Sequence, residues 1–365
     1  MSPIPKNNSN KRIAVVGGGI FGLTAALWLD AAGFAVDVYE SREDILLGAS
    51  GANQLRSHRG YHYPRSSETI ISCNQSTPRF EEAFSSAIVK DAKRFYAIPT
   101  EGSRVRPEEY LRILDEHQLP YTVSECVLLD PSKISLVIEV KEHAIDIHAL
   151  KREFKQRLDA SRVRMIFNTT ATEQTTQAYD TVIVAAYGHL NEFFGENSEH
   201  QKVYQYELCE KPLVRLPEEF KDISLVIIDG PFFCLDPYGT TGLHLLGSVE
   251  HAIHHRETSK GMHTPTHLAD FLHRGLISVP SHSNIEAFLG LIREFIPSLG
   301  DVEHIGSFYT IRSVLPFKDH TDERPTIVQK INDRIVTVFS GKIGTCIDVA
   351  EEIVRIVRDG GSSTG

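Results

Sequence analysis

The chain has 365 residues, of which 41% are hydrophobic, and it carries a formal net charge of −10 at pH 7. This length suggests about two domains, and acids and bases that are interspersed along the chain offer no basic surface for nucleic acid. No apolar run approaches the roughly 18 residues of a membrane helix, and the first residues lack the apolar core of a signal peptide. We therefore expect a cytoplasmic protein, without a membrane span, that acts on a small-molecule substrate.

The first elements are predicted in the order strand, glycine turn, helix. Residues 13–16 are an apolar run typical of a buried parallel strand, and four glycines follow within the next six residues. Apolar residues then continue with helical spacing over 23–29. This order is typical of the unit that binds the diphosphate of a dinucleotide.

Each glycine of this turn has a distinct expected task. Gly17 permits the tight turn, Gly19 lets backbone N–H groups approach a pyrophosphate, and Gly22 lets the helix pack closely on the strand. The helix N-terminus at Ile20 and Phe21 directs unpaired N–H groups and the positive end of the helix dipole toward the phosphates.

A second strand is predicted over 35–39 and ends at Glu40. This carboxylate can accept hydrogen bonds from both ribose hydroxyls of an adenosine, and it repels a 2′-phosphate, which argues against NADP. With Ser41 and Arg42 it forms the expected adenosine end of the site. These residues alone leave NAD and FAD open.

The segment that follows is polar and rich in His and Arg. A surface loop is the ordinary interpretation of such a composition, but this segment leads directly out of the nucleotide-binding strand. Few solvated loops carry so many groups able to bind anions or move protons. The cofactor candidates here are Ser50, Gly51, Asn53 and Gln54, and the substrate candidates are Arg56, His58, Tyr61 and Tyr63.

Two stretches carry a family resemblance. GGGIFGLTAALWLDAAGFAVDVYE resembles the FAD-binding opening of the D-amino-acid-oxidase-type flavoprotein superfamily, which includes glycine oxidase. SGANQLRSHRGYHYP is similar to the second motif of its L-2-hydroxyglutarate dehydrogenase and glycerol-3-phosphate dehydrogenase branches. The resemblance implies FAD rather than NAD, with Ser50 and its neighbours around the diphosphate and His58 beside the flavin, where substrate binds.

The resemblance also implies an α/β fold. It predicts a Rossmann-like FAD-binding domain of the glutathione-reductase type and an α+β substrate domain with a mixed or antiparallel sheet. We expect the FAD-binding domain to comprise residues 11–75, 140–195 and 305–360. The substrate domain then comprises 76–139 and 196–304, with flexible tails at 1–10 and 361–365.

Between these motifs the pattern predicts further elements. Phe80, Phe84, Ile88 and Phe95 fall near one helical face, which is more typical of a core than of a cofactor site. Residues 285–295 are predicted to form a helix.

Residues 179–191 read as a buried strand that ends in a glycine turn. They resemble the superfamily's VVxAAG strand, whose end approaches the cofactor, and this places Ala186 and Gly188 at the FAD. Tyr187 stands between them as an insertion, so the backbone path there departs from the family pattern.

Metal binding is not expected. The five cysteines are scattered without a CxxC pair, which favours reduced thiols over a disulfide framework or a zinc site. A histidine-rich segment lacks the HExxH pattern and carboxylates in a set register, so we expect a polar loop over or near the substrate cavity. Its histidines are His251, His254, His255, His263, His267 and His273.

The C-terminal part is predicted to return to the nucleotide-binding domain through a strand, the turn GKIGT and an amphipathic helix. A glycine turn that opens a helix favours anions. In the resembled family the corresponding turn reaches the pyrimidine edge of the flavin, where negative charge collects on reduction. The implied flavin-edge residues are Gly341, Lys342, Ile343, Gly344 and Thr345, with Lys342 also a catalytic candidate.

The preceding segment, SFYTIRSVLPFKDHTDERPTIV, resembles the superfamily's RP…D…P block. Arg312 is carried over as the candidate clamp for a substrate carboxylate, because a guanidinium binds a carboxylate through two parallel hydrogen bonds. Tyr309 is a further candidate for catalysis and substrate binding. The alternative for Arg312 is a structural ion pair with a nearby acid.

These residues together predict an FAD-dependent oxidase or dehydrogenase of the amine, amino-acid or 2-hydroxy-acid type. Hydride leaves a CH–NH or CH–OH carbon of a small, carboxylate-bearing metabolite for flavin N5. His58 is the candidate base for an alcohol, whereas an amine bound as the free base needs none. Oxygen or another acceptor then reoxidises the flavin. The alternatives are a flavin monooxygenase, whose usual second glycine–aspartate motif is absent from the sequence, and a non-flavin NAD-binding protein.

Overall fold

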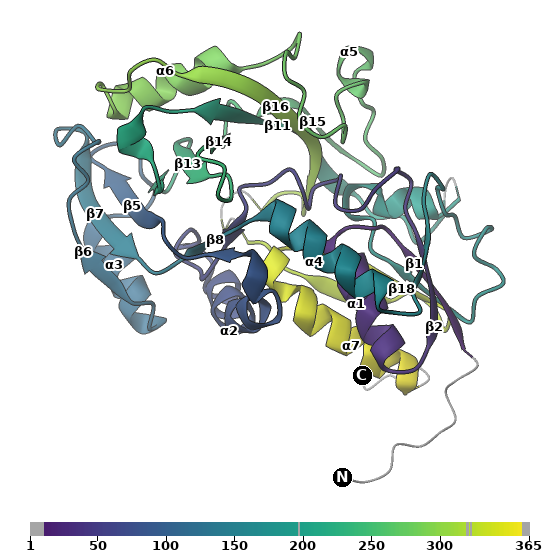
Figure 1. Ribbon diagram of the computed structural model, residues 1–365. Helices are drawn as coiled ribbons and strands as arrows, with labels where there is room; N and C mark the ends of the chain where they lie inside the picture. The colour runs from purple at the N-terminus through teal and green to yellow at the C-terminus, as the bar shows by residue number, and fades with distance from the viewer. Residues whose placement is uncertain (1–10, 196–197, 319–320, 322, 360–365) are drawn as a thin grey trace.

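The computed structural model describes residues 11–195, 198–318, 321 and 323–359. Its first layer is a six-stranded sheet in which five strands run parallel and β17 pairs antiparallel at one edge (Figure 1). In spatial order the strands are β17 (Ile327–Lys330), β18 (Ile335–Phe339), β10 (Thr181–Val184), β1 (Arg12–Val16), β2 (Ala35–Tyr39) and β9 (Arg164–Ile166).

The central strand β1 is apolar throughout its last four residues because both of its faces are covered. Ile13 and Val15 pack with α1 (Ile20–Ala31), α4 (Ile147–Asp159) and α7 (Cys346–Arg358). Ala14 and Val16 belong to a second core with Phe193, Tyr204 and Ile311, which come from outside the sheet. A strand buried on both faces requires an apolar run rather than an alternating pattern.

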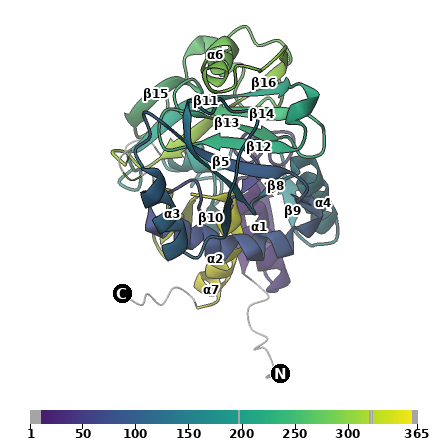
Figure 2. The ribbon, with the colours of Figure 1, turned by 90° about the vertical axis from the view of Figure 1, so that its left-hand side faces the viewer.

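The second layer is a nine-stranded mixed sheet, which Figure 2 shows above the first. Its path is β15 (Ile253–Ser259), β11 (Tyr204–Arg215), β14 (His244–Ser248), β13 (Phe233–Pro237), β12 (Ile223–Ile227), β5 (Lys93–Pro99), β7 (Ile134–Val140) and β6 (Tyr121–Val123), and β16 (Glu303–Val314) pairs with β11. Helix α6 (Ile285–Phe295) packs on β13 and β14, while α3 (Pro107–Glu116) packs on the β5 and β7 part.

Short elements join the layers. β3 (Arg56–Ser57), β8 (His143–Ile145) and β4 (Ile88–Val89) form a small sheet. The remaining helices are α2 (Ser67–Ala83), α5 (Thr266–Ala269), η1 (Ser85–Ala87), η2 (Tyr187–Phe193), η3 (Glu218–Phe220) and η4 (Ile343–Thr345).

The structure confirms the predicted α/β fold class and corrects two local expectations. The prediction that Phe80, Phe84, Ile88 and Phe95 share one helical face is wrong. Helix α2 ends at Ala83, and Ile88 and Phe95 lie on β4 and β5. The histidine-rich segment is not wholly a loop, since His254 and His255 lie on β15. Strands from residues 12–39, 164–184 and 327–339 meet in the first sheet; the domain boundaries stay a prediction.

Candidate FAD and substrate site

A cavity of about 910 Å³ lies between the two layers. The carboxyl ends of β1, β2, β10 and β18 open into it from one side, and β11, β13 and β16 line it from the other. Among the described residues that line it there are ten Lys and Arg but only six Asp and Glu, in a chain whose net charge is −10. This concentration of positive charge favours an anionic ligand.

The glycine turn has the close contacts that the sequence predicts. Gly17 has φ of +110°, and a Cβ there would lie 2.6 Å from the Ala185 carbonyl oxygen. A Cβ on Gly22 would lie 2.0 Å from the Gly17 carbonyl oxygen, so α1 can begin against the turn only with glycine at this position. The glycines of the turn therefore present backbone to the cavity.

Glu40 lies buried at the end of β2. Its Oε2 accepts a hydrogen bond from the Gly18 N–H at 2.7 Å, and its Oε1 accepts one from the Arg42 N–H at 2.9 Å. These two contacts fix the carboxylate beside the glycine turn, at the adenosine end that the sequence predicts.

The second motif closes over the start of α1. Ser50 Oγ accepts a hydrogen bond from the Ile20 N–H at 3.0 Å. Asn53 holds the loop in shape, since its Nδ2 donates to the Ala49 and Ser50 carbonyls and its Oδ1 accepts from the Leu55 N–H at 2.7 Å. Ser50 thus lies at the helix N-terminus, a position that favours an anion; its contact with a diphosphate stays a prediction.

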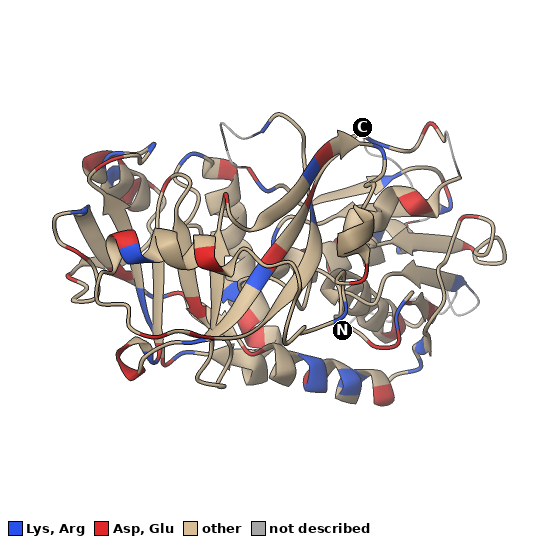
Figure 3. Cartoon of the chain, turned by 90° about the horizontal axis from the view of Figure 1, so that it is seen from above, with Lys and Arg blue, Asp and Glu red and all other residues tan. Residues whose placement is uncertain are grey.

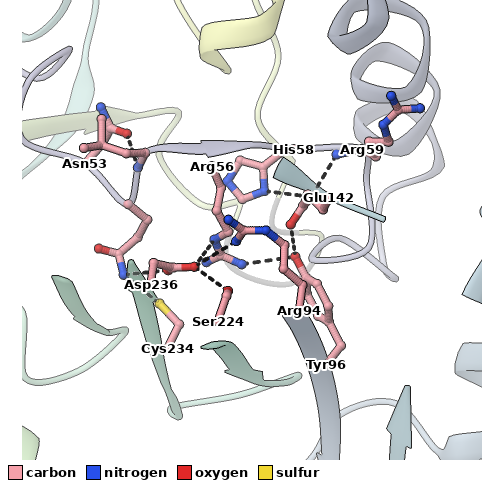
Figure 4. Close-up of polar contacts among 12 residues, drawn as sticks. Asn53, Arg56, His58, Arg59, Arg94, Tyr96, Glu142, Ser224, Cys234 and Asp236 are labelled. Carbon is pink, nitrogen blue, oxygen red and sulfur yellow. Dashed lines mark hydrogen bonds and ion pairs between the residues drawn. The ribbon is translucent and has the colours of Figure 1, made fainter. Parts of the chain in front are cut away.

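At the other end of the cavity His58 faces a buried carboxylate, Glu142 (Figure 4). His58 Nδ1 lies 3.6 Å from Glu142 Oε1, and Glu142 accepts hydrogen bonds from the Arg59 N–H at 2.9 Å and the Tyr96 hydroxyl at 2.7 Å. Burial and the nearby Lys342 lower the pKa of His58 to about 4, against an opposing effect of Glu142. The imidazole is therefore neutral at pH 7 and able to accept a proton.

Arg56 belongs to a fully buried charge cluster beneath His58. Its Nε lies 3.2 Å from Asp236 Oδ1, and its guanidinium also donates to Tyr96 at 3.1 Å. Ser224 and Arg94 contact the same Asp236 oxygen at 2.7 and 3.5 Å. Figure 4 shows both guanidiniums directed at Asp236. The charge of Arg56 is thus largely balanced inside the protein.

Lys342 faces the cavity rather than bulk solvent. Its Nζ lies 4.3 Å from the centre of the Tyr63 ring, within the range of a cation–π contact. Burial and the charge of Arg56 lower its pKa to about 7. A small change in local charge can therefore shift the protonation of this amine near neutral pH.

Arg312 lies on β16 opposite Glu207 on β11. Its Nε donates to Glu207 at 2.5 Å and its Nη2 contacts the same oxygen, while Arg256 pairs with Glu207 at 3.0 Å. The carboxylate is buried, so this guanidinium already has an internal partner. The assignment of Arg312 to a substrate carboxylate stays a prediction.

The structure brings most of the predicted site residues together. Those that line the cavity are Gly17, Gly19, Ile20, Phe21, Glu40, Ser41, Arg42, Ser50, Asn53, Gln54, Arg56, His58, Tyr63, Ala186, Gly188, Arg312, Gly341, Lys342 and Ile343. Gly22, Gly51, Tyr61, Tyr309, Gly344 and Thr345 are not among them. Their assigned roles stay predictions.

The two tyrosines that lie outside the cavity lining are buried and hydrogen-bonded elsewhere. The Tyr61 hydroxyl donates to the Pro120 carbonyl at 2.7 Å. The Tyr309 hydroxyl donates to the His282 carbonyl and lies 3.4 Å from Glu210. Both contacts are of the kind that buried tyrosines make in a core.

Among the charged residues that escaped the sequence interpretation are Glu142, Glu207 and Lys211. Glu142 follows a strand far from His58 in sequence, and the other two lie on β11 among apolar residues. No motif marks them. Only the alternation of Glu207, Cys209 and Lys211 along β11, which places all three on the cavity side, could have pointed to the latter pair.

Some side chains of the histidine-rich segment contact carboxylates. His254 contacts Glu210 at 2.9 Å, His263 contacts Glu257 at 2.9 Å, and His273 lines the cavity. Across the part of the chain that the structure describes, no group of three or more His, Cys, Asp and Glu could hold a metal ion. No helix in that part is long and apolar enough to cross a membrane.

Comparison with known proteins places this site in a family. The family model DAO, described as FAD dependent oxidoreductase, matches residues 12–341. The chain therefore belongs to this family, which confirms both the resemblance and the cofactor FAD inferred from it. The glycine turn fits the cofactor because it brings the backbone of the α1 N-terminus to the cavity, where the positive end of the helix dipole favours a diphosphate, and the Glu40 carboxylate at the end of β2 fits the hydroxyls of its ribose.

Two fungal proteins are similar to the chain over 95% of its length. The FAD-dependent monooxygenase FPY4 of Fusarium mangiferae is 25% identical over 91% of its own length. The FAD-dependent monooxygenase kojA of Aspergillus flavus is 25% identical over 86% of its own length.

Solved structures share the fold. Glycine oxidase from Geobacillus kaustophilus matches with a TM-score of 0.71 and 12% identity, over 97% of this chain and 96% of that one. L-proline dehydrogenase from P. horikoshii matches with a TM-score of 0.69 and 13% identity, over 98% and 95% of the two chains. Glycerol-3-phosphate dehydrogenase from Bacillus halodurans, complexed with FAD, matches at 0.56 and 14%, over 97% and 65%.

Proposed function

We propose that this FAD-dependent oxidoreductase removes a hydride from the CH–NH or CH–OH carbon of a small, carboxylate-bearing metabolite. The observation that carries the proposal is His58, a neutral imidazole in the cavity that is held against the buried carboxylate Glu142. FAD supplies the redox chemistry when bound, by accepting the hydride at N5. The protein must then orient the donor carbon and manage one proton.

His58 is suited to accept that proton. Glu142 lies on the Nδ1 side of the ring, so a proton on Nδ1 faces a carboxylate, and Nε2 is left to receive the proton of a substrate hydroxyl. The imidazolium formed would then be stabilised by the Glu142 charge. Because Glu142 also accepts from Tyr96 and from the Arg59 backbone, its position is fixed before substrate binds.

The wall of the cavity opposite the glycine turn suits a small polar substrate. β11 and β13 contribute Lys211, Cys209 and Cys234 to it, and β16 contributes Thr310 and Arg312. These groups offer hydrogen bonds and positive charge to an acid.

The proposal is tested by anaerobic reduction of the purified holoprotein. Amino acids, 2-hydroxy acids and free amines are added one at a time, absorbance of oxidised flavin is followed, and air is admitted afterwards. We expect at least one class of compound to bleach the flavin. Recovery of the flavin absorbance in air identifies oxygen as an acceptor. If none of the three classes reduces the flavin, the proposal is wrong.

The His58→Asn variant then separates alcohol from amine donors. An alcohol needs the base, so its rate of flavin reduction should fall by about 100-fold or more. A free-base amine should be affected far less. His148→Asn, at an exposed position on α4, is the matched control.

A second candidate function is a flavin monooxygenase, which the names of the two fungal relatives favour. Such an enzyme would consume NADPH or NADH and insert an atom of labelled oxygen into its product. Oxidation of a nicotinamide cofactor without any direct reduction by amines or hydroxy acids would support this candidate.

A further inference from the structure

Lys211 is a cation on the cavity wall that the function above does not yet use. It lies near the middle of β11, its side chain is half-buried, and it lines the cavity next to Cys209. Within the described part of the chain, its Nζ forms no hydrogen bond or ion pair. An ammonium group that is partly shielded from water in this way is stabilised by a counter-charge.

The described neighbours of Lys211 supply no such charge. Burial raises the pKa of the Cys209 and Cys234 thiols, so both are uncharged at neutral pH. Burial also lowers the pKa of Lys211 itself, and the charges of Arg312 and Arg56 act in the same direction. Among the described residues, no carboxylate therefore balances the charge of Lys211.

Several other cations of the cavity, unlike Lys211, form an ion pair with a carboxylate. Arg56 has Asp236, Arg65 has Asp229, and Arg312 shares Glu207 with Arg256. If a substrate carboxylate bound Arg312, it would have to compete with Glu207, a carboxylate that is already buried and doubly paired. Breaking a buried ion pair is costly, because it leaves a charge without its partner.

Lys342 is a second cavity cation for which the described residues form no ion pair, but it belongs to the opposite wall. It lies in the turn between β18 and α7 and contacts the Tyr63 ring. That turn is part of the layer that holds the cofactor. Lys211 lies on β11, in the sheet that faces this turn across the cavity.

We propose that Lys211, rather than Arg312, binds the acidic group of the substrate, and that the Arg312–Glu207–Arg256 cluster is a structural part of the cavity wall. This inference rests on the proposed function in that it takes the substrate to be a small carboxylic acid. Arg312 then serves to neutralise Glu207, and Lys211 supplies the charge that selects acids over neutral analogues.

The test measures binding of benzoate, an acid that a flavoenzyme cannot oxidise at a CH–OH or CH–NH carbon. The FAD-loaded protein is titrated with benzoate and with its uncharged analogue benzamide, and binding is followed by calorimetry and by changes in flavin absorbance. We expect wild-type protein to bind benzoate at least tenfold more tightly than benzamide. Lys211→Met should lose at least tenfold in benzoate affinity, while Lys211→Arg should stay within threefold of the wild type.

Controls separate this role from a structural one. Lys133→Met removes an exposed lysine and should change neither affinity. Arg312→Met should cost less benzoate affinity than Lys211→Met does. FAD content and the thermal midpoint show whether each variant is folded, and Lys211→Gln replaces Lys211→Met if the latter does not hold FAD.

Two results would overturn the inference. One is wild-type holoprotein that binds benzoate no better than benzamide. The other is a loss in Arg312→Met that exceeds the loss in Lys211→Met. Because benzoate is not turned over, Lys211-dependent binding can stand even where no amine or hydroxy acid reduces the flavin, and that combination refutes the proposed function alone.

Discussion

At the scale of single residues, the site depends on titratable groups whose pKa values are shifted by burial and by neighbouring charges. Burial raises the pKa of Glu142, but His58, Arg56 and Arg94 more than offset this and lower it to about 2. The pKa of His58 is also lowered, and for a histidine this favours the neutral form. The result is a neutral base beside a fixed negative charge, which is the arrangement that proton abstraction requires.

The pH dependence of turnover follows from this arrangement. With an alcohol substrate, kcat/KM should be level near neutral pH and fall as pH drops toward 4, because His58 becomes protonated and can no longer act as a base. Glu142→Gln removes the charge that favours imidazolium, so we expect a kcat lower by about tenfold and an acid limb displaced to still lower pH. An acid limb that does not move in this variant would contradict the role of Glu142.

Lys342 should act on the redox potential of the flavin. A positive charge beside the pyrimidine edge stabilises the reduced form, so Lys342→Met should lower the two-electron midpoint potential by about 30 mV for each tenfold change in equilibrium. The difference should shrink above pH 7, where the wild-type amine loses its proton. Equal potentials for Lys342→Met and wild type at pH 6 would place the amine away from the flavin.

At the scale of elements, the spacing of apolar residues predicted those helices and strands whose formation depends on neighbouring residues in the sequence. The strand at 35–39 and the helix at 285–295 have the predicted bounds, because their periodicity and flanking residues agree. The helical face from Phe80 to Phe95 was misassigned because Phe80 does pack on Phe84, which in turn packs on Phe154, while the chain beyond them forms strands. Pairing with β8 and β7 decides that outcome, and no local pattern shows it.

The contact between α1 and the glycine turn gives a stability prediction. Gly22→Ala places a methyl group on the Gly17 carbonyl, so we expect about 1–3 kcal/mol of destabilisation together with weaker FAD binding. Gly290→Ala is the matched control, because it is also within a helix and a Cβ there meets nothing within 4 Å. This control should be neutral or stabilise by up to about 1 kcal/mol. Urea unfolding measures both, and equal effects would contradict the close approach.

At the scale of the whole molecule, the two sheets are held together by β11 and β16. Tyr204 and Ile311 pack with the first sheet, whereas Leu213 and Val214 pair with β14 in the second. Figure 3, viewed from above, shows these long strands crossing the molecule, with acidic and basic residues distributed along the chain. The cavity lies where the two layers meet, so its substrate-facing residues come from segments far apart in sequence. For this reason one sequence motif predicted the nucleotide end of the cavity, whereas no single motif predicted the residues at the substrate end.

Buried neutral histidines should make stability depend on pH. Burial lowers the pKa of His58 to about 4 and that of His62 well below 6.5. Their contribution to the free energy of unfolding is complete above about pH 6.5 and is lost as pH falls, because the unfolded chain then binds protons that the folded chain does not. Between pH 6.5 and 5 each should cost about 1 kcal/mol per pH unit. Urea unfolding of wild type and His58→Gln should show a shallower loss in the variant; parallel losses would contradict this account.

The central claim is that the protein breaks a substrate C–H bond by passing hydride to FAD. The most direct measurement is the rate of anaerobic flavin reduction with a substrate identified above and with the same molecule deuterated at the reacting carbon. The account predicts reduction that is severalfold slower with the deuterated substrate, and slower still in His58→Asn if the substrate is an alcohol. Equal rates for the two isotopologues, or a flavin that only a nicotinamide cofactor reduces, would contradict it.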